Sequence, residues 1–205
     1  MISIKKDWSA GNNLLFHAIS HGDTNDVIAL LEDKEAKVNC TNINGATPLH
    51  FAVYYQNPDI VEVLLKNGAN PNALEFQDVG YCTPLHRAIE RNNYEICKTL
   101  LMNGADPNIV EKNGFTALHY ACRKGFEDIV KLLIDHGVDI NKRDGFGYNA
   151  SYWAKTMDHN HLLGLLPPPA KRTADELYEH RLIVNRVHEV PPPKGKKKKK
   201  GKKKK

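Results

Sequence analysis

The chain has 205 residues, of which 41% are hydrophobic, so it has enough apolar side chains for a core and is not expected to be disordered throughout. No apolar run reaches the ~18–20 residues that span a bilayer, and the first residues do not resemble a secretory signal, so we expect no integral membrane segment. The four cysteines form no close pair, which favours reduced thiols over a disulfide framework or a zinc ribbon.

The formal net charge of +5 is unevenly distributed along the chain. Residues 191–205 contain ten lysines and no acidic residue. Subtracting those ten from the 29 basic residues leaves 19 against 24 acidic residues, so residues 1–190 carry a formal charge of −5. The basic character of the protein therefore belongs to its last fifteen residues alone.

Two linked motifs recur along residues 11–166. The first is Thr47-Pro48-Leu49-His50, which returns with its threonine 36 residues later (47 to 83) and then 33 residues later (83 to 116). The second motif is an apolar helix pattern that ends at a glycine, namely Gly68, Gly104 or Gly137. Each glycine is followed by Ala or Val, then by Asn or Asp, and, after one further residue, by an asparagine. A fixed period of this length is typical of stacked repeats.

The local chemistry of each motif predicts a pair of helices. Thr83 is a good N-cap, and Pro84 fits the first helical position because no backbone donor is lost there; Thr47 and Pro48 repeat this arrangement. The glycines follow the second helix, where a left-handed residue is needed. The pairs of apolar residues that precede these glycines in each second helix are expected to fill the seam between neighbouring repeats, since no single repeat buries enough surface by itself.

These motifs resemble the ankyrin repeat. The resemblance implies an all-α solenoid of helix pairs with β-hairpin fingers, over residues 11–169, in five repeats at about 11–43, 44–79, 80–112, 113–145 and 146–169. The first and last repeats are degenerate and act as caps, the last with a truncated helix at Leu162–Leu166. Three extra residues fall within 73–82, which is a finger in this family, since stacked helices do not absorb insertions.

The resemblance also assigns structural roles to the residues of the first motif. It implies that each histidine bonds its threonine and the adjacent hairpin backbone; the residues are Thr47, His50, Thr83, His86, Thr116 and His119. Two interpretations of the repeat-end asparagines remain open. They either bond the hairpin backbone or resemble positions that asparaginyl hydroxylases modify, and they are Asn39, Asn72, Asn108 and Asn141.

Three further segments flank the repeats. Residues 1–10 form an N-terminal arm. A capping box at Thr173–Glu176 predicts a helix over residues 170–190, which either docks on the last repeat, binds a partner, or stays solvated. Residues 191–205 cannot bury anything, and their charges repel one another, so a disordered polylysine tail is expected.

No catalytic constellation, cofactor-binding loop or metal-ligand cluster is recognisable, so the chain is predicted not to be an enzyme and to need no cofactor or metal. A protein-binding surface is expected on the concave face, which in this fold consists of the first helices and the fingers. The second repeat contributes Ile43, Asn44 and Ala46 to it. The full set of candidates that follows is rich in aromatics and arginines: Phe51, Tyr54, Tyr55, Tyr81, Arg87, Glu90, Arg91, Lys112, Asn113, Phe115, Tyr120, Arg123, Lys124, Phe146, Tyr148 and Trp153.

The function expected from these features is that of a protein-binding adaptor or scaffold, monomeric by itself and cytoplasmic. Its partner on the concave face is not identified by the sequence. The tail Lys194–Lys205 would contact an acidic partner without sequence readout, such as tubulin tails or nucleic acid. Two alternatives remain: a structural component of a microtubule or ciliary assembly, or a nuclear regulator that binds a transcription or chromatin factor.

Overall fold

The computed structural model describes residues 10–76 and 81–168. The chain divides into two units, residues 1–171 and 172–205, and the second lies outside the described residues. The predicted helix at 170–190, the tail at 191–205 and residues 1–9 of the predicted arm also lie outside them.

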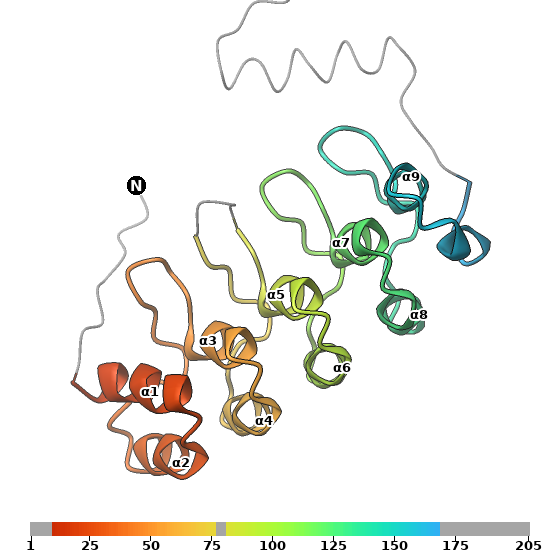
Figure 1. The fold of residues 1–205 in the computed structure, drawn as a ribbon. Coiled ribbons are helices and arrows are strands. Elements are labelled where there is room, and N and C mark those ends of the chain that lie inside the picture. The colour runs from red at the N-terminus through yellow and green to blue at the C-terminus, as the bar shows by residue number, and fades with distance from the viewer. Residues whose placement is uncertain (1–9, 77–80, 169–205) are drawn as a thin grey trace, which may run out of the picture. The chain divides into compact units, whose positions relative to one another are not determined.

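The described residues form consecutive helix pairs, as the repeats predicted. In each pair a first helix is followed after a tight turn by a second one, and Figure 1 shows the second helices lying beneath the first. The helices are α1 (Ala10–His21), α2 (Thr24–Glu32), α3 (Pro48–Tyr54), α4 (Pro58–Lys66), α5 (Pro84–Glu90), α6 (Tyr94–Met102), α7 (Ala117–Lys124), α8 (Glu127–Asp135), α9 (Ala150–Thr156) and the 3₁₀ helix η1 (Asn160–Gly164).

The connections from each second helix to the next first helix project away from the helices as long fingers (Figure 1). The backbone pairing in these fingers is less extensive than the predicted β-hairpins. Among the described residues the fingers contain two isolated antiparallel bridges, Glu75 with Cys82 and Arg143 with Asn149, and no strand. The last repeat also differs, because its second helix is a 3₁₀ turn at Asn160–Gly164. This segment has five residues, and Pro167 after it cannot continue a helix. The tighter 3₁₀ geometry is common in such short segments and at helix ends.

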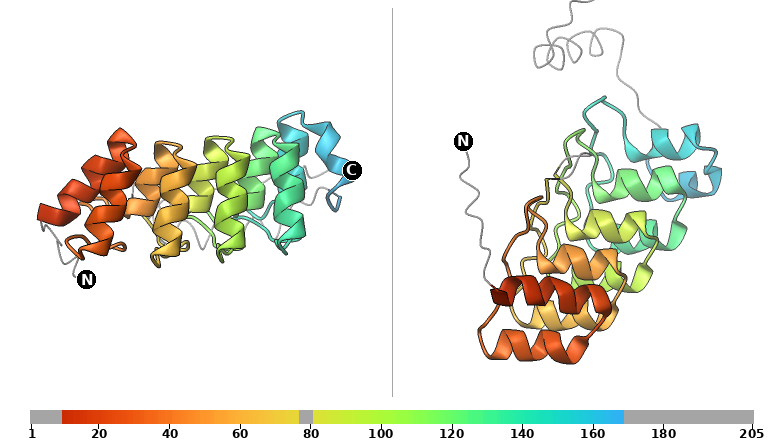
Figure 2. Two further views of the ribbon diagram at one scale, coloured as in Figure 1. Left: turned by 90° about the horizontal axis from the view of Figure 1, so that it is seen from below. Right: turned by 60° about the vertical axis from the view of Figure 1, so that its left-hand side comes forward.

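The apolar faces of these helices meet in one continuous core. Each first helix packs on the next, from α1 to α9, and α2, α4, α6 and α8 pack on one another in the same order; Figure 2 shows the two rows. The seam between repeats is filled by fully buried side chains such as Leu64, Leu100 and Leu133. Since each repeat is covered by its neighbours, stability comes from the interfaces between repeats.

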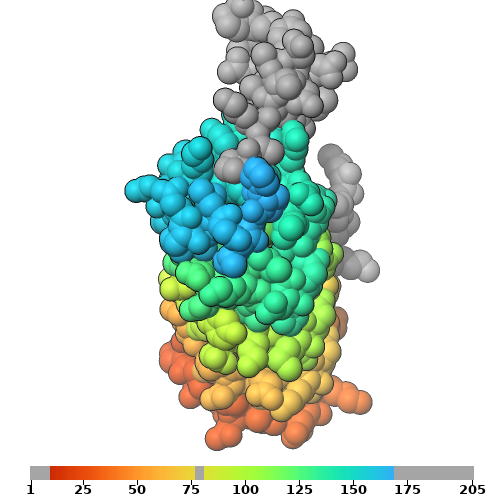
Figure 3. Space-filling view, turned by 90° about the vertical axis from the view of Figure 1, so that its right-hand side faces the viewer, coloured from red at the N-terminus to blue at the C-terminus, as the bar shows by residue number. Residues whose placement is uncertain are grey.

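The C-terminal end of this stack is closed by the last repeat. Figure 3 shows this end, where residues of α9 and η1 lie against the preceding repeat. Leu162 of η1 is fully buried there. The side chain of Ser151 donates to the carbonyl of Pro167, and that of Asn149 donates to the carbonyl of Pro168, so the chain leaving η1 is fastened back to α9. The last repeat therefore acts as the predicted cap.

His50 and His119 make both bonds that the resemblance implied, whereas His86 bonds Thr83 but has no hydrogen-bond partner at Nε2 among the described residues. The backbone N–H of Thr47 donates to His50 Nδ1 at 3.2 Å, which places the ring proton on Nε2, and Nε2 lies 3.1 Å from the Cys82 carbonyl oxygen of the next finger. His119 repeats this arrangement with Thr116 and with the Tyr148 carbonyl. Each ring thereby caps its own helix and fastens the following finger to it.

The repeat-end asparagines connect neighbouring repeats. Asn72 donates through Nδ2 to the Gly104 carbonyl, and its Oδ1 accepts from the Asp106 backbone N–H at 2.8 Å. Asn39 and Asn108 make the same pair of bonds one repeat away in each direction. These three amides therefore bond backbone, as one of the two interpretations predicted, and the backbone belongs to the next repeat.

Two neighbouring fingers approach each other closely enough to exclude a side chain. The backbone N–H of Gly145 donates to the Asn113 carbonyl at 2.7 Å, and a Cβ at Gly145 would lie 2.4 Å from that oxygen. We expect Gly145→Ala to lower the free energy of unfolding by about 2 kcal/mol, because backbone must move to relieve the clash. Gly164→Ala is the matched control, since a Cβ there meets nothing within 4 Å. Urea unfolding measures both, and equal losses would contradict the close approach.

Candidate functional site: the concave face

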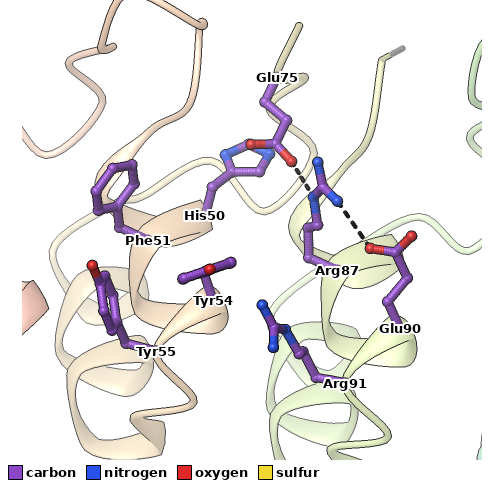
Figure 4. Close-up of a pocket in the computed structure, with 8 residues that line it drawn as sticks. All are labelled: His50, Phe51, Tyr54, Tyr55, Glu75, Arg87, Glu90 and Arg91. Carbon is purple, nitrogen blue, oxygen red and sulfur yellow. Dashed lines mark hydrogen bonds and ion pairs between the residues drawn. The ribbon is translucent and has the colours of Figure 1, made fainter. Parts of the chain in front are cut away.

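A cavity on the concave face lies between the second and third repeats. Its volume is about 290 Å³, and its wall on the second repeat is aromatic while its wall on the third repeat is charged (Figure 4). The lining residues are His50, Phe51, Tyr54, Tyr55, Glu75, Arg87, Glu90 and Arg91. Helices α3 and α5 supply the two walls because they pack side by side, and the finger that follows α4 supplies Glu75.

The charged wall is held by a buried ion pair. Arg87 donates through Nε to Glu75, whose side chain is 4% exposed, and through Nη1 to Glu90 at 2.9 Å. Burial disfavours the charge on Arg87, but the hydrogen bonds and charges of the two glutamates outweigh it and raise the pKa of the guanidinium. Arg87 is therefore fixed in place as part of the wall.

Arg91 is placed differently from Arg87. Its guanidinium carbon lies 4.4 Å from the centre of the Tyr54 ring, a cation–π contact between the third and second repeats. The structure gives it no ion pair with another described residue. Arg91 and Tyr54 are both exposed, so the edge of the guanidinium is available to an incoming acceptor.

A second aromatic cluster covers the fourth and fifth repeats. Phe115 packs edge-on against Tyr120 and Trp153, with ring centres 5.8 and 5.3 Å apart. Arg123 lies over the Trp153 ring at 5.8 Å, and the indole N–H of Trp153 donates to Asp144 at 2.7 Å. Aromatic rings that are fixed by neighbours in this way offer contact area at small entropic cost.

The structure corrects two of the predicted surface residues. Phe115 is 6% exposed, because its ring fills the space between Tyr120 and Trp153, and it cannot present itself to a partner. Ala46 is 2% exposed beneath its finger. Tyr120, Tyr148 and Trp153 are half-buried, since neighbouring rings cover part of each one.

The other predicted residues fall into two groups. Six of them line the cavity: Phe51, Tyr54, Tyr55, Arg87, Glu90 and Arg91. The remaining ones are exposed on the fingers or on α7: Ile43, Asn44, Tyr81, Lys112, Asn113, Arg123, Lys124 and Phe146. Their exposure makes them available for binding.

Sequence reasoning missed Glu75 as part of the cavity. The acceptors of the other fingers stand five residues before the repeat threonine or its equivalent, where Asn42, Glu111 and Asp144 each accept two backbone N–H groups of their own finger. Glu75 stands eight residues before Thr83, and its carboxylate bonds Arg87 instead. The sequence did contain a signal for this difference: Glu75 is shifted from the position of the other acceptors, and it lies in the finger that has the insertion.

The described residues offer little for catalysis. Within residues 10–76 and 81–168 no group of three or more His, Cys, Asp or Glu could hold a metal ion. All four cysteines are buried, and burial raises the pKa of Cys97 and of Cys122 to about 12, so both are thiols and not thiolates at neutral pH. Nor does the described part of the chain contain a helix long and apolar enough to cross a membrane.

Comparisons with curated proteins match short stretches of the chain. An ankyrin repeat protein of Acanthamoeba polyphaga mimivirus is 67% identical over 30 residues, 15% of this chain and 2% of that protein. Palmitoyltransferase akr1 of Schizosaccharomyces pombe is 40% identical over 60 residues, 29% of this chain and 9% of its own length. An ankyrin repeat protein of fowlpox virus is 40% identical over 58 residues, 28% of this chain and 13% of its own. The chain thus spans less than a seventh of each of these relatives.

Family models cover much more of the chain. The model described as "Ankyrin repeats (3 copies)" matches residues 2–75 and 85–171, and the one described as "Ankyrin repeats (many copies)" matches residues 54–101. The matched residues contain every described helix pair, together with the histidines and asparagines that join one repeat to the next. By its sequence and its fold alike, this chain belongs to the ankyrin repeat family.

Proposed function

We propose that this chain is a non-catalytic adaptor that holds a partner protein on its concave face. Membership of the ankyrin repeat family indicates protein–protein interaction. The observation that most supports the location is the cavity between α3 and α5, where exposed tyrosines face arginines across two repeats. These are the residue types that dominate the energetics of protein interfaces. The match to the palmitoyltransferase covers 9% of that protein, and we propose no transferase activity for this chain.

The partner is to be identified by proximity labelling in cells and then used as the binding probe. Replacing Tyr54, Arg91 and Arg123 together by Ala should weaken its affinity by about 30-fold or more, since truncating a central hot spot commonly costs ~2 kcal/mol. All three side chains are exposed or half-buried, so the fold should persist, and circular dichroism checks this. An unchanged dissociation constant, measured by calorimetry, would exclude the concave face as the binding site.

We propose a separate role for the polylysine tail. Ten lysines without arginines or aromatics would contact carboxylates or phosphates through charge alone, with a steep dependence on salt. Tubulin tails and nucleic acid are the candidate surfaces. A weak tail contact linked to a specific concave-face contact would raise the local concentration of the partner and increase the combined affinity.

The proposed location is the cytoplasm, and imaging a tagged protein with and without residues 191–205 tests it. Diffuse cytosolic staining supports the adaptor. Fibrous or ciliary staining would instead favour a structural component of a microtubule assembly, and tail-dependent nuclear staining would favour a nuclear regulator.

A further inference from the structure

The two rows of helices carry opposite charge. The second helices α2, α4, α6 and α8 contain eight carboxylates against three lysines. The first helices α1, α3, α5, α7 and α9 contain four cations against one carboxylate, Glu90, and Glu90 is bonded to Arg87. The −5 charge of residues 1–190 is therefore a poor guide to what a partner meets on the concave face.

The fingers beside the first helices strengthen this asymmetry. Of their carboxylates, Glu75, Glu111 and Asp144 are each 3% exposed and are engaged by Arg87, by backbone N–H groups or by Trp153, whereas Asp106 and Asp139, which follow α6 and α8, are exposed. Their cations Lys112, Lys142 and Arg143 are exposed. In the two fingers that precede α7 and α9, three cations and two carboxylates are thus exposed.

Two arginines on this face are pre-positioned for an acceptor. Arg91 lies on Tyr54 at 4.4 Å and Arg123 lies over Trp153 at 5.8 Å, so an aromatic ring orients each guanidinium. Neither makes an ion pair with a described residue. A guanidinium that stacks through its face keeps its N–H edge for bidentate contact with a carboxylate.

The cavity beside Arg91 has the size and lining for one large apolar side chain. Its volume of about 290 Å³ is at the lower limit for small-molecule sites, and three aromatic residues of the second repeat form one wall. Arg91, the C-cap of α5, leans toward α3, and Arg123 of α7 leans toward α9, so their guanidinium groups lie about two interhelix spacings apart, or ~16–20 Å. An extended segment covers that distance in about six residues.

We infer that the partner segment bound on the concave face is acidic, with one aromatic side chain in the cavity between α3 and α5 and carboxylates about six residues apart on Arg91 and Arg123. This inference rests on the proposed adaptor function and adds the chemistry of the ligand to it. Opposite charge speeds the encounter and excludes basic competitors, while the aromatic side chain in the cavity supplies affinity.

The test uses the full chain and three fluorescein-labelled peptides of about 12 residues. One is rich in Glu and Asp with a central Phe, the second has Ala in place of that Phe, and the third has Gln in place of the acids. Fluorescence anisotropy should show the first peptide binding at least ~10-fold more tightly than either of the others, which corresponds to losing one anchor or one pair of charged contacts.

A matched pair of charge reversals separates the concave face from general electrostatics. Arg91→Glu with Arg123→Glu should weaken binding of the first peptide at least ~10-fold, whereas Lys66→Glu with Lys98→Glu should change it less than ~2-fold. Lys66 and Lys98 are exposed on α4 and α6, so both variants lose the same charge, and both keep the tail, whose contribution cancels in the comparison. Arg91→Gln with Arg123→Gln, checked by circular dichroism, should show a smaller loss in the same direction.

Three results would overturn the inference. Equal weakening by the two reversals would mean that binding depends on net charge alone. Equal binding of the first and third peptides would exclude a role for the carboxylates. Tighter binding of a single-stranded RNA of about 12 nucleotides, lost on reversal of Arg91 and Arg123, would assign the face to nucleic acid. Each leaves the adaptor function standing if the partner found by labelling still requires Tyr54, Arg91 and Arg123, and both proposals fail if it does not.

Discussion

Acidification from about pH 7 to about pH 4 should lower the free energy of unfolding by about 6 kcal/mol through His50 and His86 alone. The pKa of each ring is lowered from 6.5 to about 4, mainly by burial and to a smaller extent by the positive charge of Arg87. Each shift of about 2.5 pH units corresponds to ~3 kcal/mol at 1.36 kcal/mol per unit. His119 adds to this effect, because burial lowers its pKa as well.

The direction follows from proton binding. Between about pH 4 and pH 6.5 the unfolded chain binds a proton at each histidine and the folded chain does not, so stability rises with pH across this window. The stabilisation from these histidines is complete above their pKa in the unfolded chain, and it is lost as the pH falls toward their pKa in the folded protein. Glu111 acts in the opposite direction, since burial raises the pKa of its carboxyl group.

Urea unfolding at several pH values measures this dependence, with substitutions to identify its source. His86→Gln should be less stable at neutral pH but should lose about 3 kcal/mol less between pH 7 and pH 4, because a neutral side chain cannot be protonated. His136→Gln is the control, since His136 is exposed at the end of α8 and its replacement should leave the slope intact. A slope unchanged in His86→Gln would refute the assignment.

Removing the carboxylate of Glu75 should cost about 3 kcal/mol of unfolding free energy. The side chain is 4% exposed and that of its partner Arg87 is 16% exposed, so Glu75→Ala leaves a largely desolvated guanidinium with Glu90 as its remaining carboxylate. Breaking a buried pair by removing one member is more costly than the pair's net contribution, because the other charge stays behind.

Glu90→Ala provides the matched control for this substitution. Glu90 bonds the same guanidinium at 2.9 Å, but its side chain is 31% exposed and water can replace it, so we expect a loss of less than about 1 kcal/mol. Chemical denaturation compares the two variants. Losses of similar size would mean that Glu75 is not the main anchor of Arg87, and that the charged wall of the cavity is held in another way.

Sequence alone predicted the repeat architecture because the repeat depends on local rules. A threonine N-cap, a proline at the first helical position and a glycine after the second helix act within a few residues, and each is visible at a fixed period. The bonding of Thr47 with His50, and of His50 with the next finger, follows the same period. Two features differ from the prediction: the described parts of the fingers contain isolated bridges in place of hairpin strands, and the second helix of the last repeat is the 3₁₀ helix η1.

The candidate surface was predicted less completely, because exposure depends on side chains from different repeats. Register placed Phe115 on the concave face, but its burial depends on how Tyr120 and Trp153 pack around it. The sequence fully determined the charges, the repeat and the capping chemistry, since these are properties of single residues and short spacings. Only the tertiary structure decided that Glu75 fixes Arg87 while Arg91 stays accessible on Tyr54, because contacts between repeats select which charges are neutralised and which face a partner.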